Sequence, residues 1–274
     1  MQRQKTVLLS TALFCLFFLT LSASAQVHPD VYSNSSLKGP YSFLGNKWLS
    51  DLDNNPGASV GIVNFDGLGN LTLSMTMNTA GTVTTYTGTG TYSVAKDGTG
   101  TLSFTLSGGP SLTDTMVLDT GGKSFQFVQI SCTGCGSDNS VSSGTAVAMG
   151  ASSFTTADLK GNYEWLLAKW TNDQNSNADV NLGTMIFDGH GNIKGSATDV
   201  SAGTPQSFTY SGTYSVNSDG SGSMTLNANG TSIMVAFVVN SASANGTGAK
   251  GLQLLKTAES GGSNSVHCGT ATKQ

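Results

Sequence analysis

The sequence carries one ten-residue pattern twice, and this internal repeat limits the possible folds more than any other feature. Residues 61–70 read GIVNFDGLGN, and residues 183–192 read GTMIFDGHGN. The correspondence continues on both sides at the same offset of 122 residues, so that Lys47-Trp48 matches Lys169-Trp170. Because both copies repeat the same apolar and turn positions, one small structural unit is present twice in the chain.

Within each copy, short runs of alternating apolar and polar residues are separated by turn residues. Leu71, Leu73 and Met75 alternate with Thr72 and Ser74, which is the period of a half-buried strand. Asp-Gly pairs between the runs are typical of hairpin turns, because glycine adopts a positive φ without steric cost. No segment shows apolar residues at helical spacing. The first copy is predicted to form strands over 41–48, 59–66, 70–77, 82–94, 100–106, 112–119, 124–130 and 141–148.

Eight consecutive strands with mostly short connections predict a meander in each copy. A meander of this length removes its unpaired edges by closing into an up-and-down barrel. The predicted fold class is therefore all-β, with two tandem eight-stranded up-and-down β-barrels. A Greek-key sandwich with longer crossing connections is the alternative. One sixteen-stranded membrane barrel disagrees with the strand lengths, since membrane-spanning strands need about 9–11 residues.

The N-terminus has the features of a secretory signal peptide. Arg3 and Lys5 precede an apolar run, and Ala23-Ser24-Ala25 provides a small-residue cleavage site. The expected mature chain begins at Gln26, keeps 249 of the 274 residues after 25 are removed, and has no membrane span. A secreted or periplasmic location is predicted. The predicted segments are 1–25 as the signal peptide, 26–36 as an N-terminal arm, 37–148 as the first barrel repeat, 149–158 as a linker and 159–274 as the second barrel repeat.

Charge narrows the range of partners. Charged residues make up 10% of the chain, and removal of Arg3 and Lys5 with the signal peptide changes the formal net charge from −4 to −6. An acidic chain with few lysines and arginines does not fit binding to nucleic acid or to anionic membranes, which attract basic surfaces. The expected partner is a small-molecule ligand. No sequence feature indicates a cofactor or a particular protein partner.

Three cysteines remain in the expected mature chain. Cys132 and Cys135 are separated by two residues and can close a small disulfide loop in an oxidising compartment, which leaves Cys268 over. A zinc site that combines this pair with His267 and Cys268 is the alternative, and it requires two distant segments to converge. The disulfide is the preferred interpretation, and no metal site is predicted.

Motifs in both copies resemble those of known barrel proteins. Gly39-x-Tyr41 and Gly161-x-Tyr163, each followed by a meander, resemble the first strand of the calycin group, which comprises lipocalins, avidins and allene-oxide-cyclase-like barrels. The longer set Leu-Lys-Gly-x-Tyr, Phe-Asp-Gly-x-Gly-Asn and Gly-Thr-Tyr-Ser-Val resembles uncharacterised secreted repeats of acidobacterial type, from which no activity can be transferred. Residues 169–177 are similar to the first strand and loop of avidins, which implies biotin contacts through Asn172 and Ser176. The resemblance as a whole implies calycin-like barrels.

Aromatic residues on the inward faces of such barrels can either line a cavity or fill it. An eight-stranded barrel has room for packed side chains or for one small ligand. Trp48 and Trp170 each follow a lysine and precede an open loop, which predicts that they lie at the barrel mouths near Asp51 and Asp173. The candidate ligand-contacting residues are Trp48, Asp51, Tyr41, Tyr92, Trp170, Asp173, Tyr163, Trp165 and Tyr214.

The sequence contains no catalytic constellation. No histidine has an equivalent in the other copy, and no serine or cysteine stands in a nucleophile motif. Asn217-x-Asp219-Gly220 resembles part of a calcium loop but lacks its distal glutamate, so a hairpin turn is favoured.

The predicted function is a secreted, non-enzymatic tandem barrel that binds a small apolar or glycan-like ligand at the barrel mouths. One alternative is a structural or adhesive surface module with filled barrels. The other is an allene-oxide-cyclase-like isomerase, which a buried acid beside a polar donor inside a lumen would favour.

Overall fold

The computed structural model describes residues 31–48, 56–135, 141–170, 179–242, 248–261 and 265–274, which belong to one compact unit. These residues are mainly in β-strands. Two one-turn 3-10 helices, η1 (Asn34–Ser36) and η2 (Thr156–Asp158), each precede the first strand of one half of the chain. Neither helix in these ranges has the length or the apolar character that a membrane crossing needs.

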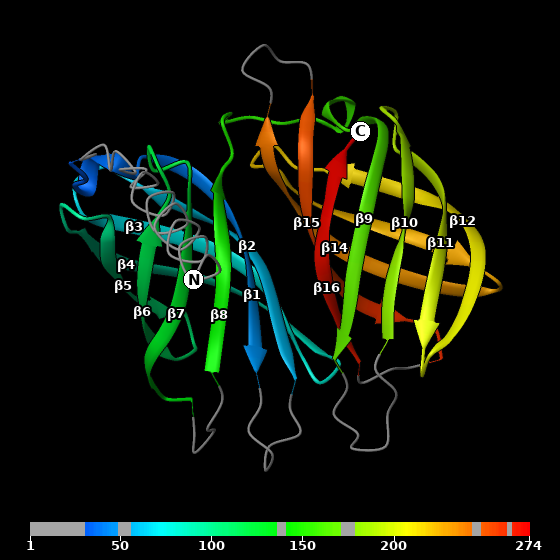
Figure 1. The fold of residues 1–274 in the computed structure, drawn as a ribbon, viewed down its shortest axis with the longest axis horizontal. Helices are drawn as coiled ribbons and strands as arrows, with labels where there is room; N and C mark the ends of the chain where they lie inside the picture. Colours follow the sequence, from blue (N-terminus) through cyan, green and yellow to red (C-terminus); the bar gives the residue numbers. More distant parts are fainter. Residues whose placement is uncertain (1–30, 49–55, 136–140, 171–178, 243–247, 262–264) are drawn as a thin grey trace, which may run out of the picture. The chain divides into compact units, whose positions relative to one another are not determined.

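The strands of the first half close into one barrel (Figure 1). Consecutive strands pair antiparallel, and the last strand returns to the first, where Tyr41 lies opposite Ala148. We call this the first barrel. Its strands are β1 (Gly39–Trp48), β2 (Gly57–Phe65), β3 (Asn70–Thr79), β4 (Thr82–Val94), β5 (Thr99–Leu106), β6 (Ser111–Leu118), β7 (Ser124–Thr133) and β8 (Val141–Ala148).

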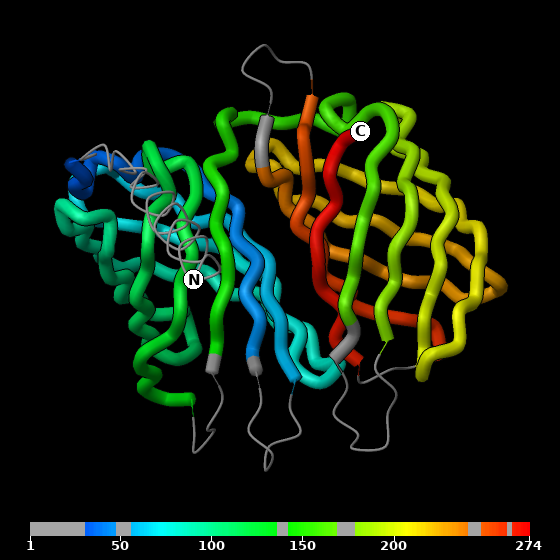
Figure 2. Tube along the Cα trace, viewed as in Figure 1, coloured from blue at the N-terminus to red at the C-terminus, as the bar shows by residue number. Residues whose placement is uncertain are grey.

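The strands of the second half form an equivalent second barrel, which is closed where Tyr163 lies opposite Lys273; Figure 2 follows the chain through both barrels. The predicted fold class is confirmed, and the Greek-key alternative is excluded because each described strand pairs with its neighbours in chain order. The strands are β9 (Lys160–Trp170), β10 (Asp179–Asp188), β11 (Asn192–Ser201), β12 (Thr204–Val216), β13 (Ser221–Ala228), β14 (Thr231–Ala242), β15 (Ala249–Glu259) and β16 (Val266–Lys273).

The repeated Asp-Gly turns are held by their aspartate side chains. Asp66 Oδ1 accepts a hydrogen bond from the backbone N–H of Asn70 (3.0 Å), and its Oδ2 accepts one from Asn70 Nδ2 (2.6 Å). Gly67, the next residue, has a φ of 81°, which a side chain would strain. The hydrogen bonds, that of the Asn70 side chain first, lower the pKa of Asp66 to about 2. Asp188 and Asn192 repeat this arrangement, and the pKa of Asp188 is also about 2.

One end of each barrel is closed by a cluster of three aromatic rings, which we call the aromatic plug. In the first barrel Phe65 lies between Tyr41 and Tyr92, with ring centroids 5.4 and 4.8 Å apart in edge-to-face geometry. Such pairs contribute about 0.5–1.5 kcal/mol each beyond the area they bury. The plug of the second barrel, with centroid distances of 5.2 and 4.9 Å, consists of Tyr163, Phe187 and Tyr214.

The outer face of β1 and β2 is buried against the second barrel. Leu44, Val60 and Ile62 point away from the first-barrel lumen and belong to the same hydrophobic cluster as Leu255 and Val266 of the second barrel.

Two backbone carbonyls accept hydrogen bonds across this contact. Asn78 Nδ2 donates to the carbonyl of Lys256 (2.9 Å), and Gln253 Nε2 donates to the carbonyl of Ser42 (3.4 Å). The contact is therefore apolar at its centre and fixed in register by polar groups.

Candidate functional site

The first barrel encloses a cavity of about 330 Å³. Small-molecule pockets typically measure about 300–1,000 Å³, so this cavity suits a small ligand. At the end opposite the aromatic plug, polar side chains that include Lys47 and Ser142 line its mouth. Its apolar lining includes Phe43, Met75, Phe104, Leu112, Phe125 and Phe127.

A single exchange between facing strands explains much of the difference between the two lumens. In the first barrel Leu73 lies opposite Gly88, whereas the equivalent pair in the second barrel is Gly195 opposite Tyr210. The Tyr210 hydroxyl accepts a hydrogen bond from Trp165 Nε1 (3.0 Å) across the second lumen, and both side chains are buried. Because Gly88 has no side chain, the first barrel lacks a phenol ring at this place. The first lumen is hollow and the second is packed.

Asp114 places an acid in the apolar lumen of the first barrel. It lies on the inward side of β6 with Leu112 and Met116, borders the cavity, and has 6% of its surface exposed. Among the described residues, its carboxyl group has no hydrogen-bond or ion-pair partner. Burial raises the pKa of Asp114 to about 7, because the charged form loses its hydration.

The second barrel shows that the fold does not need an acid at this position. Leu102 on β5 lies opposite Asp114, and its counterpart Met224 on β13 lies opposite Val235. Val235 is buried in the core of the second barrel. The carboxyl group of Asp114 is therefore a particular property of the first barrel.

A β-bulge in β7 places an amide beside this acid. Asp114 lies opposite Gln129 while Thr113 lies opposite Ser131, so Ile130 is an extra residue in the strand. Ile130 is exposed on the outer surface, and Gln129 borders the cavity. Bulges redirect side chains in this way and are frequent next to functional sites. The lumen thus presents a carboxyl and a carboxamide on neighbouring strands.

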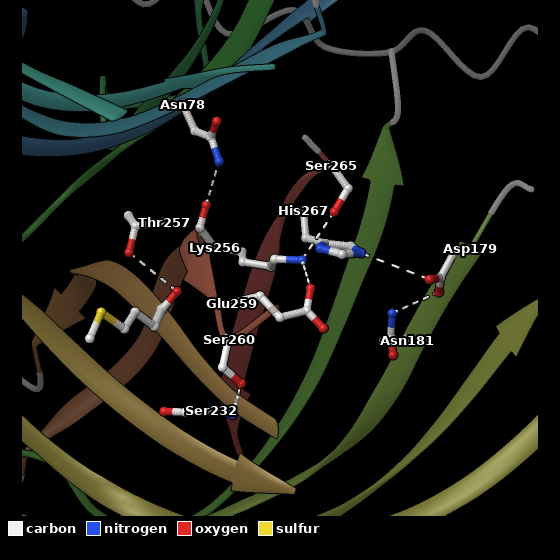
Figure 3. Close-up of polar contacts among 11 residues, drawn as sticks. Asn78, Asp179, Asn181, Ser232, Lys256, Thr257, Glu259, Ser260, Ser265 and His267 are labelled. Atoms are coloured by element: carbon white, nitrogen blue, oxygen red, sulfur yellow. Dashed lines mark hydrogen bonds and ion pairs between the residues drawn. The ribbon is translucent and has the colours of Figure 1, made fainter. Parts of the chain in front are cut away.

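The corresponding region of the second barrel holds an ion pair instead (Figure 3). Lys256 Nζ donates hydrogen bonds to Glu259 Oε2 (2.5 Å) and to Ser265 Oγ (3.0 Å). His267 Nε2 on β16 lies 3.9 Å from Asp179 Oδ2 on β10, and these two strands pair with opposite sides of β9. The buried lysine is paired within its own barrel, in contrast to the acid of the first barrel.

The predicted contact residues Tyr41, Tyr92, Tyr163 and Tyr214 lie in the aromatic plugs. Their hydroxyls donate hydrogen bonds to backbone carbonyls at 2.6, 2.8, 2.6 and 2.7 Å, respectively. Burial raises the pKa of each hydroxyl, so these groups remain protonated donors. The plug tyrosines of the first barrel do not border its cavity, and Trp165 fills the second lumen.

The other four predicted contact residues lie wholly or partly outside the described part of the chain. Asp51 and Asp173 fall outside the described residues. Trp48 and Trp170 are the last residues of β1 and β9, and their side chains are likewise outside the described part. Ligand contacts by these four residues remain predictions. Lys47, next to Trp48, borders the mouth of the cavity.

The cysteines do not converge on a metal site. Cys132 and Cys135 are joined by a disulfide, and Cys135 borders the cavity mouth. Cys268 Sγ lies 2.8 Å from Asn46 Oδ1 of the first barrel, while the preceding residue in the strand, His267, faces the opposite side. Within the described ranges, no three His, Cys, Asp or Glu side chains are grouped closely enough to hold a metal ion.

Sequence reasoning missed the residues that define the cavity. Gly88 stands where the other copy has Tyr210, and this difference is visible at the repeat offset. Asp114 interrupts the apolar alternation of Leu112, Met116 and Leu118, which marks it as an inward-facing acid.

The fold and the cavity define a tandem up-and-down β-barrel protein with one hollow and one packed barrel. No family model and no curated protein matches the chain. Among solved structures, it is similar to a protein of unknown function from the DUF3598 family of Nostoc punctiforme PCC 73102, with 9% identity over 89% of this chain and 99% of that chain and a TM-score of 0.27. It is also similar to intact Ap-TbpB with its N and C lobes, with 9% identity over 90% of this chain and 77% of that chain and a TM-score of 0.27. The assignment of the fold rests on the strand order and closure described above.

Proposed function

We propose that this chain is an exported, non-enzymatic binding protein whose first barrel holds one small, mainly apolar ligand in its lumen. The observation that carries this proposal is the cavity of about 330 Å³ in the first barrel, beside a packed lumen in the second. Empty apolar space lowers stability, because the surrounding side chains lose packing contacts. A module that serves only as a spacer has no use for such a space.

The lining supports an apolar ligand over a glycan. Sugar recognition needs many hydrogen-bonding groups, whereas the wall carries four phenylalanine rings and only a few polar side chains, most of them at the mouth. The alternative function, a structural module with filled barrels, fits the packed second barrel but not the first. Export is supported by the signal-peptide pattern, and N-terminal sequencing of the protein from its host is expected to begin at Gln26.

Filling the first lumen tests the binding function. The double substitution Leu73→Gly and Gly88→Tyr gives the first barrel the strand pair of the second, and the tyrosine ring is expected to occupy the cavity. The neutral fluorescent probe N-phenyl-1-naphthylamine should bind the wild-type protein in a 1:1 complex. We expect the filled variant to bind it at least tenfold more weakly, with an unchanged far-UV circular dichroism spectrum.

A substitution in the second barrel provides the control. Tyr210→Phe removes the hydroxyl at the position equivalent to Gly88 and leaves the first cavity intact. This variant should keep the wild-type affinity of the cavity in the first barrel. Equal probe binding by the wild-type and filled proteins would show that the probe does not use the first lumen, and would remove the basis of the proposal.

The pair Asp114 and Gln129 favours one second candidate, an isomerase-type enzyme. An acid with a pKa of about 7 can both donate and accept a proton at neutral pH, which is what general acid–base catalysis needs. The two functions predict different behaviour of Asp114→Asn. An enzyme would keep its ligand and lose turnover, whereas a binding protein would show only a changed affinity.

A further inference from the structure

We infer that the ligand of the first barrel is an amine, with a small apolar body in the lumen and an ammonium group that pairs with Asp114. This inference rests on the proposed binding function and assigns the chemical class of the ligand. The chain supplies no cation for this acid among its described residues, so the missing partner is a property of the bound molecule.

The position of Asp114 argues for a cationic partner. The carboxyl group is 6% exposed, borders the cavity and lacks a described protein partner. A buried carboxylate without a partner is unfavourable, and an opposite charge within hydrogen-bond distance removes most of that cost. A neutral apolar ligand would displace water from the cavity and remove the remaining hydration of the Asp114 carboxylate without replacing it. A carboxylate ligand would add a like charge beside it.

The lining suits a cation for a second reason. Phe43, Phe104 and Phe127 border the same cavity, and the faces of aromatic rings attract ammonium groups, by about 0.5–2 kcal/mol where water is excluded. The Gln129 carboxamide oxygen, on the strand next to Asp114, can accept a further ammonium hydrogen. The negative net charge of the chain adds a weak long-range attraction for cations.

No described residue next to Asp114 carries a charge that would compete with a cationic ligand. Its direct neighbours are Leu102 on β5 and Gln129 on β7, which are both uncharged. The other charged side chain among the described lining residues is Lys47, which is placed on β1 at the mouth of the barrel.

Three ligands with one apolar body and different head groups test the inference. n-Octylamine, n-octanol and octanoate are titrated by calorimetry into the full mature chain at pH 8. We expect octylamine to bind at least tenfold more tightly than octanol, and octanoate to bind most weakly. Asp114→Asn should bring the affinity for octylamine down to that for octanol. Asp97→Asn removes an equal charge from an exposed turn, and it should keep the amine preference.

The pH dependence of the wild-type protein gives a second readout that needs no variant. An ammonium ion pairs with the ionised acid, so octylamine affinity should fall at least tenfold from pH 8 to pH 5, as Asp114 takes up a proton. The affinity for octanol should change less than twofold over the same range.

The outcomes separate this inference from the proposed function. If octanol binds as tightly as octylamine, or if Asp114→Asn keeps the amine preference, the lumen binds apolar ligands but the amine assignment is wrong. If octanoate binds most tightly, the head group pairs with another residue and the amine assignment is also wrong. If no member of the series and no apolar probe binds, the proposed function itself fails.

Discussion

Buried polar side chains in the two barrels are of two kinds, and the presence of a partner distinguishes them. The Tyr41 and Tyr163 hydroxyls each donate to a backbone carbonyl at 2.6 Å, so burial leaves them satisfied and they hold the plugs together. Asp114 has no such partner among the described residues. A group that opposes folding in this way indicates a site where function, rather than stability, determines the residue.

Removal of this acid should stabilise the protein in a pH-dependent manner. Folded Asp114 has a pKa of about 7, raised by burial from an ordinary value of 3.8. The folded state therefore binds a proton more tightly than the unfolded chain, and stability decreases as the pH rises from about 4 to about 7. We expect Asp114→Asn and Asp114→Val to raise the free energy of unfolding at pH 8 by about 2–4 kcal/mol, with a much smaller difference at pH 4. Urea unfolding at the two pH values measures this effect, and a pH-independent difference would contradict it.

At the scale of single elements, the turn after β2 and the turn after β10 have the same aspartate-centred hydrogen bonds in both copies of the repeat. The turn geometry depends on one aspartate that accepts hydrogen bonds from the backbone and from an asparagine four residues later. These interactions are local in sequence. They need no information from the rest of the barrel, and both copies therefore form them in the same way.

The turn aspartates should contribute to stability until strongly acidic pH. In the folded protein the pKa values of Asp66 and Asp188 are about 2, below the ordinary value of 3.8. Their contribution is present above about pH 4 and is lost as the pH falls toward 2, because protonation removes the charged acceptor. Asp66→Asn with Asp188→Asn should give a shallower loss of thermal stability between pH 4 and pH 2 than the wild type. The single variants should each show part of the effect, and an unchanged slope in the double variant would argue against these hydrogen bonds.

The packing of a lumen depends on residues that strand pairing places opposite one another. The exchange of Leu73 and Gly88 for Gly195 and Tyr210 acts across two paired strands, and neither residue alone determines the volume of the barrel. In each barrel the strand register places a large side chain opposite a glycine. The cavity is therefore a property of strand pairing rather than of any short motif.

For the whole molecule, the fold was predictable from the sequence and the site was not. Alternation and Asp-Gly turns are local signals that specify strands and hairpins, and the repeat identifies two barrels. Thr105 pairs with Ser111, whereas its counterpart Asn227 pairs with Ser232, so the pairing in the first barrel is shifted by one residue. The constant offset therefore aligns Asp114 with Ala236 instead of with Val235. The bulge at Ile130 shifts the register again. The alternation of Leu112 and Met116 indicates that Asp114 faces inward, but its equivalence to Val235 follows only from the actual pairing.

The outer face of β1 and β2 in the first barrel has an equivalent on β9 and β10 in the second barrel. The face of β1 and β2 is buried against the second barrel, and the equivalent face on β9 and β10 is exposed. Val60 on β2 is 2% exposed in the contact with the second barrel, whereas its counterpart Leu182 on β10 is 52% exposed. Leu44 and its counterpart Leu166 differ in the same way. The same strand face therefore has two different environments in one chain, which makes each position a control for the other.

This pair of positions tests whether the two barrels unfold as one cooperative unit. Val60→Asp places a charge in an apolar contact, and we expect it to cost more than about 2 kcal/mol and to split the calorimetric transition into two, because the barrels lose their shared cluster. Leu182→Asp introduces the same charge at the equivalent exposed position and should change stability by less than about 0.5 kcal/mol. Two separate transitions in the wild-type protein, or equal effects of the two substitutions, would show that the contact contributes little. A single wild-type transition that only Val60→Asp divides would show that the covered face couples the folding of the hollow barrel to that of the packed one.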